Sequence, residues 1–525
     1  MIVERTDPEV PARNADLQVT LEVPIPSRLP VGRPTAVLCR GTCFHRRRPV
    51  ERMTILVDGV PHRPTASRMP RPDLFRSLHP RLASRARRDP ESVEDPELRS
   101  YRSGFWGTVP IPARERPGEV ELRVDAALAN GARAGATLGR IEVVDPSEPL
   151  RSEWPKIAGD GGLIAVCMAT FDPDVELLRT QIESLRAQTD RRWLCLISDD
   201  CSAQDRYEAI EATVGRDPRF VLSRSARRRG FYRNFERALR MLPPEAELVA
   251  LCDQDDRWYP DKLETLRGAI RGVELAYSDL RLVDPHGGVL AESLWERRPH
   301  RRPELISLLL ANTIPGAASL FRRRVVDYAL PFPEGPGWQF HDHWLGVAAA
   351  AIGDVAYVDR PLYDYVQHPG AVLRGRIAGG AAPPANASDE NRRDKRDLAP
   401  RRVIGRWRGA YFYAYQPLAL WAHVLLERCA ARLTRRKRRA LRRLIAADRS
   451  PFAWLWLASG SLRASLTRSE IHATEGLLCG AIVWRHLVAA RAARGTRPSG
   501  SAADASAPPF DPRLLESTRG ARRRL

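Results

Sequence analysis

Residues 161–256 alternate between continuously apolar runs and segments whose apolar residues recur every three or four positions. The runs GLIAVCMATFD and WLCLISDD have no polar face, which is typical of parallel strands covered on both sides. Between them, a segment that starts at Pro173 places Leu178, Ile182 and Leu185 along one helical stripe. This alternation predicts a doubly wound α/β domain, and ligands of such domains bind beyond the carboxyl ends of the strands.

Acidic residues gather at those carboxyl ends. Asp199 and Asp200 end the run WLCLISDD, and Asp253, Asp255 and Asp256 follow the run ELVALC. Three carboxylates within four positions repel one another unless a cation neutralises them, and carboxylate oxygens suit Mg²⁺ or Mn²⁺. Mg²⁺ usually binds one or two carboxylates plus substrate phosphates, so the cluster predicts a metal-mediated phosphate site. A solvated acidic turn before the next helix is the alternative interpretation.

Residues 15–146 follow a different period. Apolar and polar residues alternate in LQVTLEVP and EVELRVDA, and RMTILVDGVP is a strand that runs into an Asp-Gly turn. We therefore predict an accessory domain that is an all-β antiparallel sandwich, with an Arg- and Pro-rich insertion over residues 62–104. The sequence assigns this domain no chemistry of its own. A spacer or packing role and a carbohydrate-binding role both stay open.

The chain is strongly basic, but its charge is unevenly placed. The net charge is +20, and residues 401–525 hold 25 Lys and Arg against 7 Asp and Glu. The first 400 residues are therefore nearly neutral, and the acid cluster lies within them. Residues 376–400 are poor in apolar residues and predict a flexible linker, 401–495 predict a basic helical region, and 496–525 predict a disordered tail.

The basic region 401–495 has two interpretations, one as a membrane-binding surface and one as a solvent-exposed surface without a partner. Arg clusters beside apolar stretches with Trp and Tyr are typical of helices that lie on an anionic membrane surface, and a solvated helical surface is the plainer alternative. Nucleic acid is not expected as a partner, since no nucleic-acid-binding module is recognisable. No run is apolar enough to span a bilayer, and the N-terminus lacks the apolar core of a signal peptide. We expect a cytoplasmic protein, peripheral on the inner face of the plasma membrane.

Four motifs in order resemble one known family, the inverting family-2 glycosyltransferases of the GT-A fold. They are AVCMATFD, SLRAQTDRRWLCLISDDCS, CDQDDRWYPDKL and HDHWLGVAAAAIGDVAYVDRPLYDYVQHPG. The resemblance covers about 163–375 and implies a GT-A domain over 160–375. DQDDRW and HDHW look most like the bacterial rhamnosyltransferase-type branch, whereas the order of the domains also resembles mycobacterial galactofuranosyltransferases. The resemblance thus implies that a hexose moves from a nucleotide-diphosphate sugar to a glycan or lipid-linked acceptor of the cell envelope.

On the donor side, the resemblance implies a nucleotide pocket and a metal site. The residues that would bind the nucleotide are Thr170, Phe171, Asp200 and Asp253. The residues that would hold Mg²⁺ or Mn²⁺ are Asp255, Asp253 and His368. Ala169 departs from the Pro or Thr that the family usually has, and Asp256 would orient the loop. A histidine of a surface loop is the alternative interpretation of His368.

On the acceptor side, the resemblance implies that Asp342 is the general base. An acceptor hydroxyl has a pKa far above neutrality, so a carboxylate that is not bound to the metal must take its proton. His341 and Trp344 flank Asp342 and could desolvate it and raise its pKa. With Gly316 of the loop NTIPGAASLF, they would contact the acceptor. A helix N-cap role for Asp342 is compatible with catalysis. The competing hypothesis, a catalytically silent carbohydrate-binding scaffold, conflicts with the presence of Asp255 and Asp342.

Overall fold

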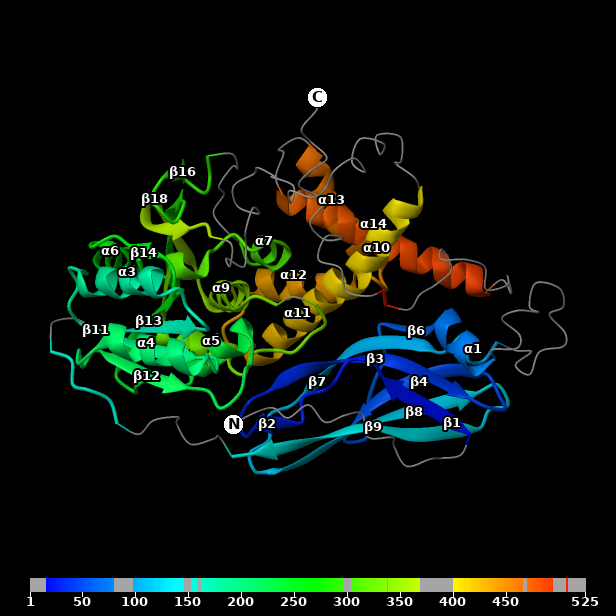
Figure 1. Cartoon of the computed structure of the whole chain (residues 1–525). Coiled ribbons are helices and arrows are strands. Elements are labelled where there is room, and N and C mark those ends of the chain that lie inside the picture. The colour runs from blue at the N-terminus through cyan, green and yellow to red at the C-terminus, as the bar shows by residue number, and fades with distance from the viewer. Residues whose placement is uncertain are drawn as a thin grey trace.

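The computed structural model describes residues 16–79, 98–145, 153–158, 162–296, 304–337, 339–368, 400–465, 470–493 and 507–508. Figure 1 shows a β-rich N-terminal part in blue to cyan, an α/β part in blue-green to yellow-green, and C-terminal helices in yellow to red that lie against both. The linker predicted over 376–400 lies outside the described residues except for Pro400, and the tail predicted over 496–525 lies outside them except for 507–508.

Parallel strands form one half of the central sheet. In sheet order they are β12 (Phe220–Arg224), β11 (Trp193–Asp199), β10 (Leu163–Thr170) and β13 (Ala246–Cys252). The helices that connect them along the chain are α3 (Val175–Arg186), α4 (Gln204–Val214) and α5 (Phe231–Leu239). Every side chain of β11 is buried, as expected of a strand with helices on both faces. The α/β alternation predicted for residues 161–256 is thus present.

The other half of the sheet makes it mixed. Strand β17 (Ser319–Arg322) pairs antiparallel with β13 and with β15 (Leu275–Val283), and β15 pairs parallel with β18 (Val355–Val366). Two short strands, β14 (Arg257–Trp258) and β16 (Val289–Ala291), pair antiparallel with β18 and β15. The remaining helical elements of this part are α6 (Lys262–Ala269), α7 (Leu305–Leu310), η1 (Gly316–Ala318), α8 (Arg323–Ala329) and α9 (His341–Ile352). Because β17 reverses the direction beside β13, the expected doubly wound parallel order ends there.

The N-terminal part contains two sheets that share one buried core. One has the order β1 (Leu17–Leu21), β3 (Thr35–His45), β7 (Gly104–Ile111) and β6 (Ala66–Met69). The other has the order β2 (Arg28–Pro30), β9 (Arg133–Val144), β8 (Gly118–Leu128), β4 (Val50–Val57) and β5 (Val60–His62). Strand β2 pairs parallel with β9, and helix α1 (Pro72–Leu78) lies within the predicted insertion, so this part is neither purely antiparallel nor purely β.

The predicted Asp-Gly turn joins β4 and β5. Asp58 and Gly59 have φ angles of 48° and 82°, so both occupy the left-handed region. A two-residue hairpin turn with positive φ at both positions matches the twist of its strands, and Asp-Gly is a preferred pair for it.

The C-terminal part is helical, as predicted. Its elements are α10 (Pro400–Ala410), a π-helical turn η3 (Tyr411–Tyr415), α11 (Gln416–Arg428), α12 (Arg435–Ala446), α13 (Pro451–Ser465) and α14 (Glu470–Ala493). The kink predicted at Pro417 takes the form of η3, directly before the first turn of α11 that holds this proline. Proline lacks an N–H and crowds the preceding turn, and a wider turn relieves that crowding. Among the helices of the described chain, none is both long enough and apolar enough to cross a bilayer.

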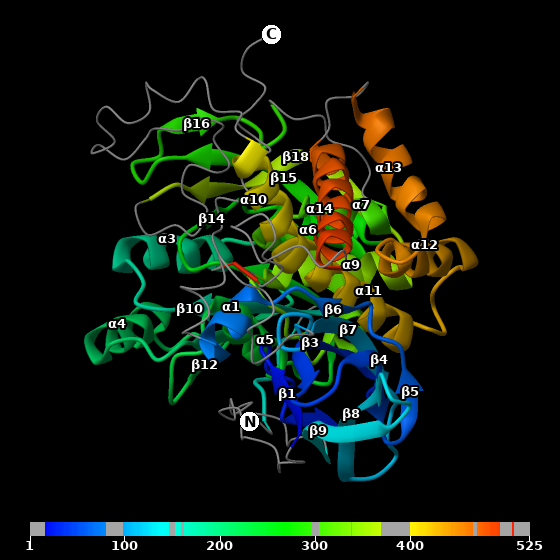
Figure 2. The same cartoon turned by 90° about the vertical axis from the view of Figure 1, so that its right-hand side faces the viewer.

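Helix α11 packs between the N-terminal sheets and the α/β part (Figure 2). On one side, the indole Nε1 of the fully buried Trp106 in β7 donates to the hydroxyl of Tyr411 (2.7 Å), and Arg40 in β3 donates to Gln416 (3.1 Å). On the other side, the ring of Trp421 lies 5.3 Å from that of Trp344 in α9. The aromatic residues of this segment therefore build the interior.

Candidate active site

The carboxyl ends of β10 and β11 are held together by a buried hydrogen-bond network. The hydroxyl of Thr170 donates to Asp199 Oδ1 (3.1 Å), and the other oxygen of Asp199 accepts the Ser202 amide (3.0 Å). Asp172 and Cys201, which follow the two strands, have φ angles of 39° and 64°. Non-glycine residues in this region carry strain and occur often at functional sites. Thr170 thus lies at the predicted edge, but its hydroxyl is occupied by Asp199.

Asp200 is bound by a neighbouring loop. Its two carboxylate oxygens accept the backbone amides of Arg229 (2.7 Å) and Gly230 (2.8 Å), and the residue is almost fully buried. Burial raises the pKa of Asp200, and these two hydrogen bonds oppose the rise. In this geometry Asp200 fixes the loop before α5. Its predicted contact with the nucleobase would have to use the carboxylate lone pairs that these two amides leave free.

Phe171 joins the end of β10 to the acid cluster. Its amide donates to Gln254 Oε1 (2.8 Å), and Gln254 Nε2 donates back to the Phe171 carbonyl oxygen (3.3 Å). The guanidinium carbon of Arg228 lies 3.9 Å from the centre of the Phe171 ring. Neither Gln254 nor Arg228 was predicted from the sequence, although Gln254 is the middle residue of Asp-x-Asp. Through this residue, the cluster and the predicted nucleotide pocket form one rigid edge.

The acid cluster lies in the loop between β13 and β14. Asp255 Oδ2 lies 2.8 Å from His368 Nε2, and this hydrogen bond is the main reason why the pKa of His368 is raised. Burial raises the pKa of Asp253 to about 7, and the charges of Asp255 and Asp342 add to that rise. The structure therefore brings Asp255 and His368, two of the three predicted metal ligands, into contact from segments far apart in the chain.

Asp256 is nearly fully buried behind this cluster. Its Oδ1 accepts the backbone amide of Val366 in β18 (3.4 Å), whereas its Oδ2 is buried without a hydrogen-bond partner. Burial raises the pKa of Asp256, and the charges of Asp255 and Asp253 raise it further. This contact links the loop to the strand that precedes His368, which agrees with the orienting role predicted for Asp256.

The residues present fit a divalent cation that is completed by substrate. Within the described ranges, no three His, Cys, Asp or Glu side chains converge into a ready-made metal cage. Yet burial, and after it the charge of Asp255, raises the pKa of Asp253, and Asp256 Oδ2 is buried without a hydrogen-bond partner, so negative charge here is not fully compensated. Mg²⁺ typically binds one or two carboxylates and takes its remaining ligands from phosphates and water. That is the ligand set this loop offers.

Lys262 is a buried cation beneath the cluster that the sequence analysis missed. Its Nζ lies 3.4 Å from the ring centre of Trp258 and donates to the carbonyl oxygen of Ala317. Burial lowers the pKa of Lys262 to about 7, while the charges of Cys252, Asp256 and Asp253 oppose the decrease. Lys262 therefore ties the acid cluster to turn η1. One feature of the sequence could have pointed to Lys262: lysine is rare in this chain, because only four of the 84 basic residues are lysine.

The carboxylate of Asp342 is held at the first turn of α9. Its Oδ1 accepts Asn312 Nδ2 (3.0 Å) and the His343 amide (2.7 Å), and its Oδ2 accepts the Gly316 amide (3.2 Å). Burial nevertheless raises its pKa to about 6. The N-cap position belongs to Phe340, so Asp342 is not the N-cap residue. A partly exposed, fixed carboxylate that is ionised at neutral pH has the properties of a general base.

The three residues predicted to contact the acceptor beside Asp342 are packed in different ways. Gly316 packs so closely that an added Cβ would lie 3.1 Å from the Asp342 Cβ and 3.3 Å from His341 Nε2. The His341 ring stacks on Phe235 at 3.6 Å, and burial lowers its pKa to about 3, so the imidazole is neutral. Trp344 is fully buried, and its indole donates to the Ala329 carbonyl oxygen (3.0 Å). The acceptor contact predicted for Trp344 is therefore wrong in this structure, because the indole belongs to the core between α9 and α11.

The comparisons with known proteins agree with the predicted family. Residues 165–329 match the family model described as Glycosyl transferase family 2. The chain contains a family 2 glycosyltransferase domain. The match ends before α9, so Asp342 and His368 lie outside it, and their roles stay predictions. It does not resolve the rhamnosyltransferase-type branch.

Two curated relatives match parts of the chain. An uncharacterized glycosyltransferase of Methanocaldococcus jannaschii, MJ1057, is 25% identical over 137 residues, which cover 25% of this chain and 47% of the relative. The uncharacterized protein y4gI of Sinorhizobium fredii is 31% identical over 118 residues, which cover 21% of this chain and 12% of the relative. The chain thus spans less than half the length of either relative.

Solved structures of glycosyltransferases also align with the chain. Residues 1–349 of TarS from S. aureus align with a TM-score of 0.36 at 12% identity, covering 64% of this chain and 93% of that one. The mannosyltransferase PcManGT from Pyrobaculum calidifontis, in complex with GDP-Man and Mn²⁺, aligns with a TM-score of 0.31 at 17% identity, covering 64% and 91%.

Proposed function

We propose that the protein is a metal-dependent inverting glycosyltransferase that moves a hexose from a nucleotide-diphosphate sugar to a cell-envelope glycan or glycolipid. Rhamnose is the sugar we test first and galactofuranose the second. The observation that carries the proposal is the position of Asp342. Its carboxylate is fixed by Asn312 and by Gly316 of turn η1, and the same turn accepts a hydrogen bond from Lys262 beneath the acid cluster. A base beside a site for a diphosphate is the arrangement that direct glycosyl transfer needs.

The acceptor side performs the proton transfer. Asp342 accepts the proton of the acceptor hydroxyl as that oxygen attacks the anomeric carbon, and the bond to the diphosphate breaks on the opposite face. One such displacement inverts the anomeric configuration. The hydrogen bonds from Asn312 and Gly316 hold the carboxylate in place for this step. The His341 imidazole beside it has a pKa lowered to about 3, so it is a weaker base than Asp342 and does not compete for the proton.

The donor side positions the nucleotide and its diphosphate. Asp253, Asp255 and His368 would hold Mg²⁺ or Mn²⁺, and the bound cation supplies Lewis-acid stabilisation of the charge on the departing diphosphate. The two hydrogen bonds between Gln254 and Phe171 hold the loop of the acid cluster against the predicted pocket for the nucleobase. Arg228 covers the Phe171 ring, and its guanidinium is available to a phosphate or a nucleobase at the mouth of this pocket.

A screen of nucleotide sugars tests the proposal. dTDP-rhamnose, UDP-galactofuranose, UDP-GlcNAc and GDP-mannose are each added to the full chain with and without Mn²⁺, and thermal stability and nucleotide release are measured. A true donor raises the unfolding temperature because it binds only the folded state. Asp342→Asn should keep this metal-dependent stabilisation but lose roughly a hundredfold or more in release and transfer rates. Asp255→Asn should lose the response to metal.

The matched control is Asp205→Asn, which removes an exposed carboxylate on α4 and should leave both readouts unchanged. If Asp342→Asn and Asp255→Asn both transfer sugar as the wild type does, the mechanism is wrong. If the wild type binds a sugar nucleotide or glycan but never releases nucleotide, the protein is the carbohydrate-binding scaffold instead.

The proposed location at a membrane surface follows from the proposed lipid-linked acceptor. A lipid-linked acceptor lies at a membrane surface, and the basic helical segment 401–495 provides the charge for peripheral attachment to its anionic inner face. We include this attachment in the proposal.

A further inference from the structure

Helix α12 has one face that anchors it and one face that is unoccupied. Leu441 and Leu444 are buried against the molecule, Arg436 pairs with Glu304 (3.1 Å), and Lys437 Nζ donates to the Gly353 carbonyl oxygen (2.8 Å). The other face carries exposed arginines at helical spacing, and no carboxylate of the described chain pairs with them. They are Arg435, Arg439, Arg442 and Arg443. Like charges gathered in this way on one face repel one another unless an anionic partner is present.

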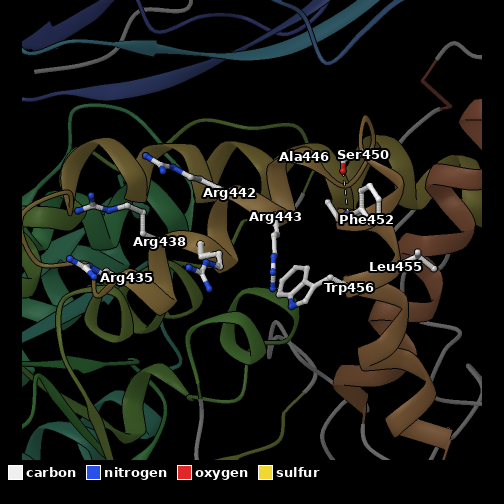
Figure 3. Close-up of a pocket in the computed structure, with 11 residues that line it drawn as sticks. Arg435, Arg438, Arg442, Arg443, Ala446, Ser450, Phe452, Leu455 and Trp456 are labelled. Atoms are coloured by element: carbon white, nitrogen blue, oxygen red, sulfur yellow. Dashed lines mark hydrogen bonds between the residues drawn. The ribbon is translucent and has the colours of Figure 1, made fainter.

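Exposed apolar side chains stand directly beside these arginines. Phe452 and Leu455, in the first turns of α13, are 81% and 56% exposed. The guanidinium of Arg443 lies 5.9 Å from the ring centre of Trp456, so the two groups adjoin (Figure 3). Together the two helices line an open groove of about 870 Å³. We call Arg435, Arg439, Arg442, Arg443, Phe452 and Leu455 the α12–α13 patch.

The patch lies at the periphery of the molecule. In Figure 2, α12 and α13 are at the right-hand edge, on the side away from α3 and α4. Phe452 is the most exposed large apolar side chain among the described residues. Because water disfavours an exposed phenyl ring, such a position is expected where another surface covers it.

We propose that the α12–α13 patch is the surface by which the protein binds an anionic lipid bilayer. The arginines contact headgroup phosphates, and Phe452 and Leu455 insert into the acyl boundary beneath them. Basic side chains next to large apolar ones on a helical surface are the composition of interfacial attachment. The patch narrows the attachment from the whole of 401–495 to two helix segments, since Tyr411, Tyr415 and Trp421 of that region are buried.

The exposed side chains of Phe452 and Leu455 favour a lipid bilayer over nucleic acid as the anionic partner. Nucleic acid would satisfy the arginines, but its bases stack on flat side chains and would leave Leu455 in water. A bilayer offers phosphates at the height of the arginines and hydrocarbon below them, so it accommodates both halves of the patch. Removing the arginines and removing the apolar pair should therefore each weaken binding.

The experiment is flotation of the full chain with vesicles of phosphatidylcholine, with and without phosphatidylglycerol. The wild type should float only with the anionic vesicles and should be released as NaCl is raised. Arg439→Gln/Arg442→Gln should weaken binding by at least about tenfold, since each basic residue near an anionic surface contributes on the order of 1 kcal/mol. Phe452→Ser/Leu455→Ser should weaken it as well, while binding that remains stays salt-sensitive.

The matched control is Arg46→Gln/Arg48→Gln, which removes the same charge from exposed positions of the N-terminal part and should leave binding unchanged. Equal losses in the control and in the α12 variant would show attraction by net charge alone and overturn the proposal. So would unchanged flotation of the apolar variant, particularly if a short RNA bound the wild type as tightly as the vesicles do. The vesicles carry no donor sugar, and the patch variants should keep metal-dependent stabilisation by the donor, so a failure here is distinct from a failure of the proposed transfer.

Discussion

Asp342 illustrates how opposing local effects set one proton affinity. Burial disfavours its charged form and raises its pKa to about 6, whereas hydrogen bonds from Asn312 and from the amides of Gly316 and His343 favour the charged form. The result is a carboxylate that is ionised at neutral pH yet more basic than an ordinary aspartate, which is what a general base requires.

The pH dependence of transfer should report this balance. A base acts only when deprotonated, so kcat should fall about tenfold per pH unit below pH 6, where an ordinary aspartate would remain active to about pH 4. Asn312→Ala removes a donor that stabilises the anion, so the pKa of Asp342 rises and the decline should begin at a higher pH. The measurement is a pH profile of kcat, with Asn130→Ala in an exposed turn as the control. A profile that is flat down to about pH 5 in the wild type would contradict a base with the raised pKa of Asp342.

At the scale of elements, local periodicity was enough for β10 to β13 and the helices between them. Each of these follows from the apolar pattern of residues 161–256. The reversal at β17 was not predictable, because it depends on a pairing between Leu248 and Arg322 that no local pattern records. Trp344 was misplaced for the same reason: its neighbour Trp421 belongs to a helix nearly eighty positions later. The positions of the acids along the chain predicted where the candidate site lies. The hydrogen bonds between Gln254 and Phe171, and the buried Lys262, could be found only in the folded structure.

The contact between turn η1 and helix α9 can be tested with one methyl group. Gly316→Ala would place a Cβ 3.1 Å from that of Asp342, so the first turn of α9 must shift. If Asp342 is the base, a displacement of a few tenths of an ångström should lower kcat by roughly tenfold with little change in donor affinity. Gly268→Ala in α6 is the control, since its added methyl group meets nothing within 4 Å and should stabilise the helix by roughly 0.5–1 kcal/mol. Steady-state kinetics and thermal unfolding of both variants decide; equal kcat values would contradict the packing described.

For the molecule as a whole, α11 is the element that joins its parts. The half-buried Arg428 donates to the carbonyl oxygens of Ala329 (2.9 Å) and Pro331 (2.7 Å) in the α/β part. The same guanidinium donates to Pro34 (3.3 Å) and Thr35 (3.0 Å) in the N-terminal part. The helix that carries it also packs on α9, so the N-terminal sheets support the helix of Asp342, although none of their described residues belongs to the candidate site.

Arg428→Met tests this connection. The variant keeps most of the side-chain volume but removes the Arg428 donor from the carbonyl oxygens of Pro331 and Pro34, whereas that of Ala329 keeps the Trp344 indole, so we expect a loss of stability of about 2–4 kcal/mol. We expect the N-terminal part to unfold separately, so that calorimetry resolves two transitions where the wild type shows one. Arg432→Met, at an exposed position one turn further on, should change neither the number nor the temperature of the transitions. A single, unshifted transition in Arg428→Met would show that the parts are held together by other contacts.

The hydrogen bond between Trp106 and Tyr411 joins residues 305 positions apart. A ribosome adds on the order of 5–20 residues per second, so roughly 15–60 s separate the synthesis of the two partners. During that interval the outer face of the N-terminal sheet, with its indole, has been made but has nothing to cover it. Each newly made copy therefore passes through a period in which this face can aggregate or bind a chaperone, and the yield of folded protein in a cell should depend on how long that period lasts.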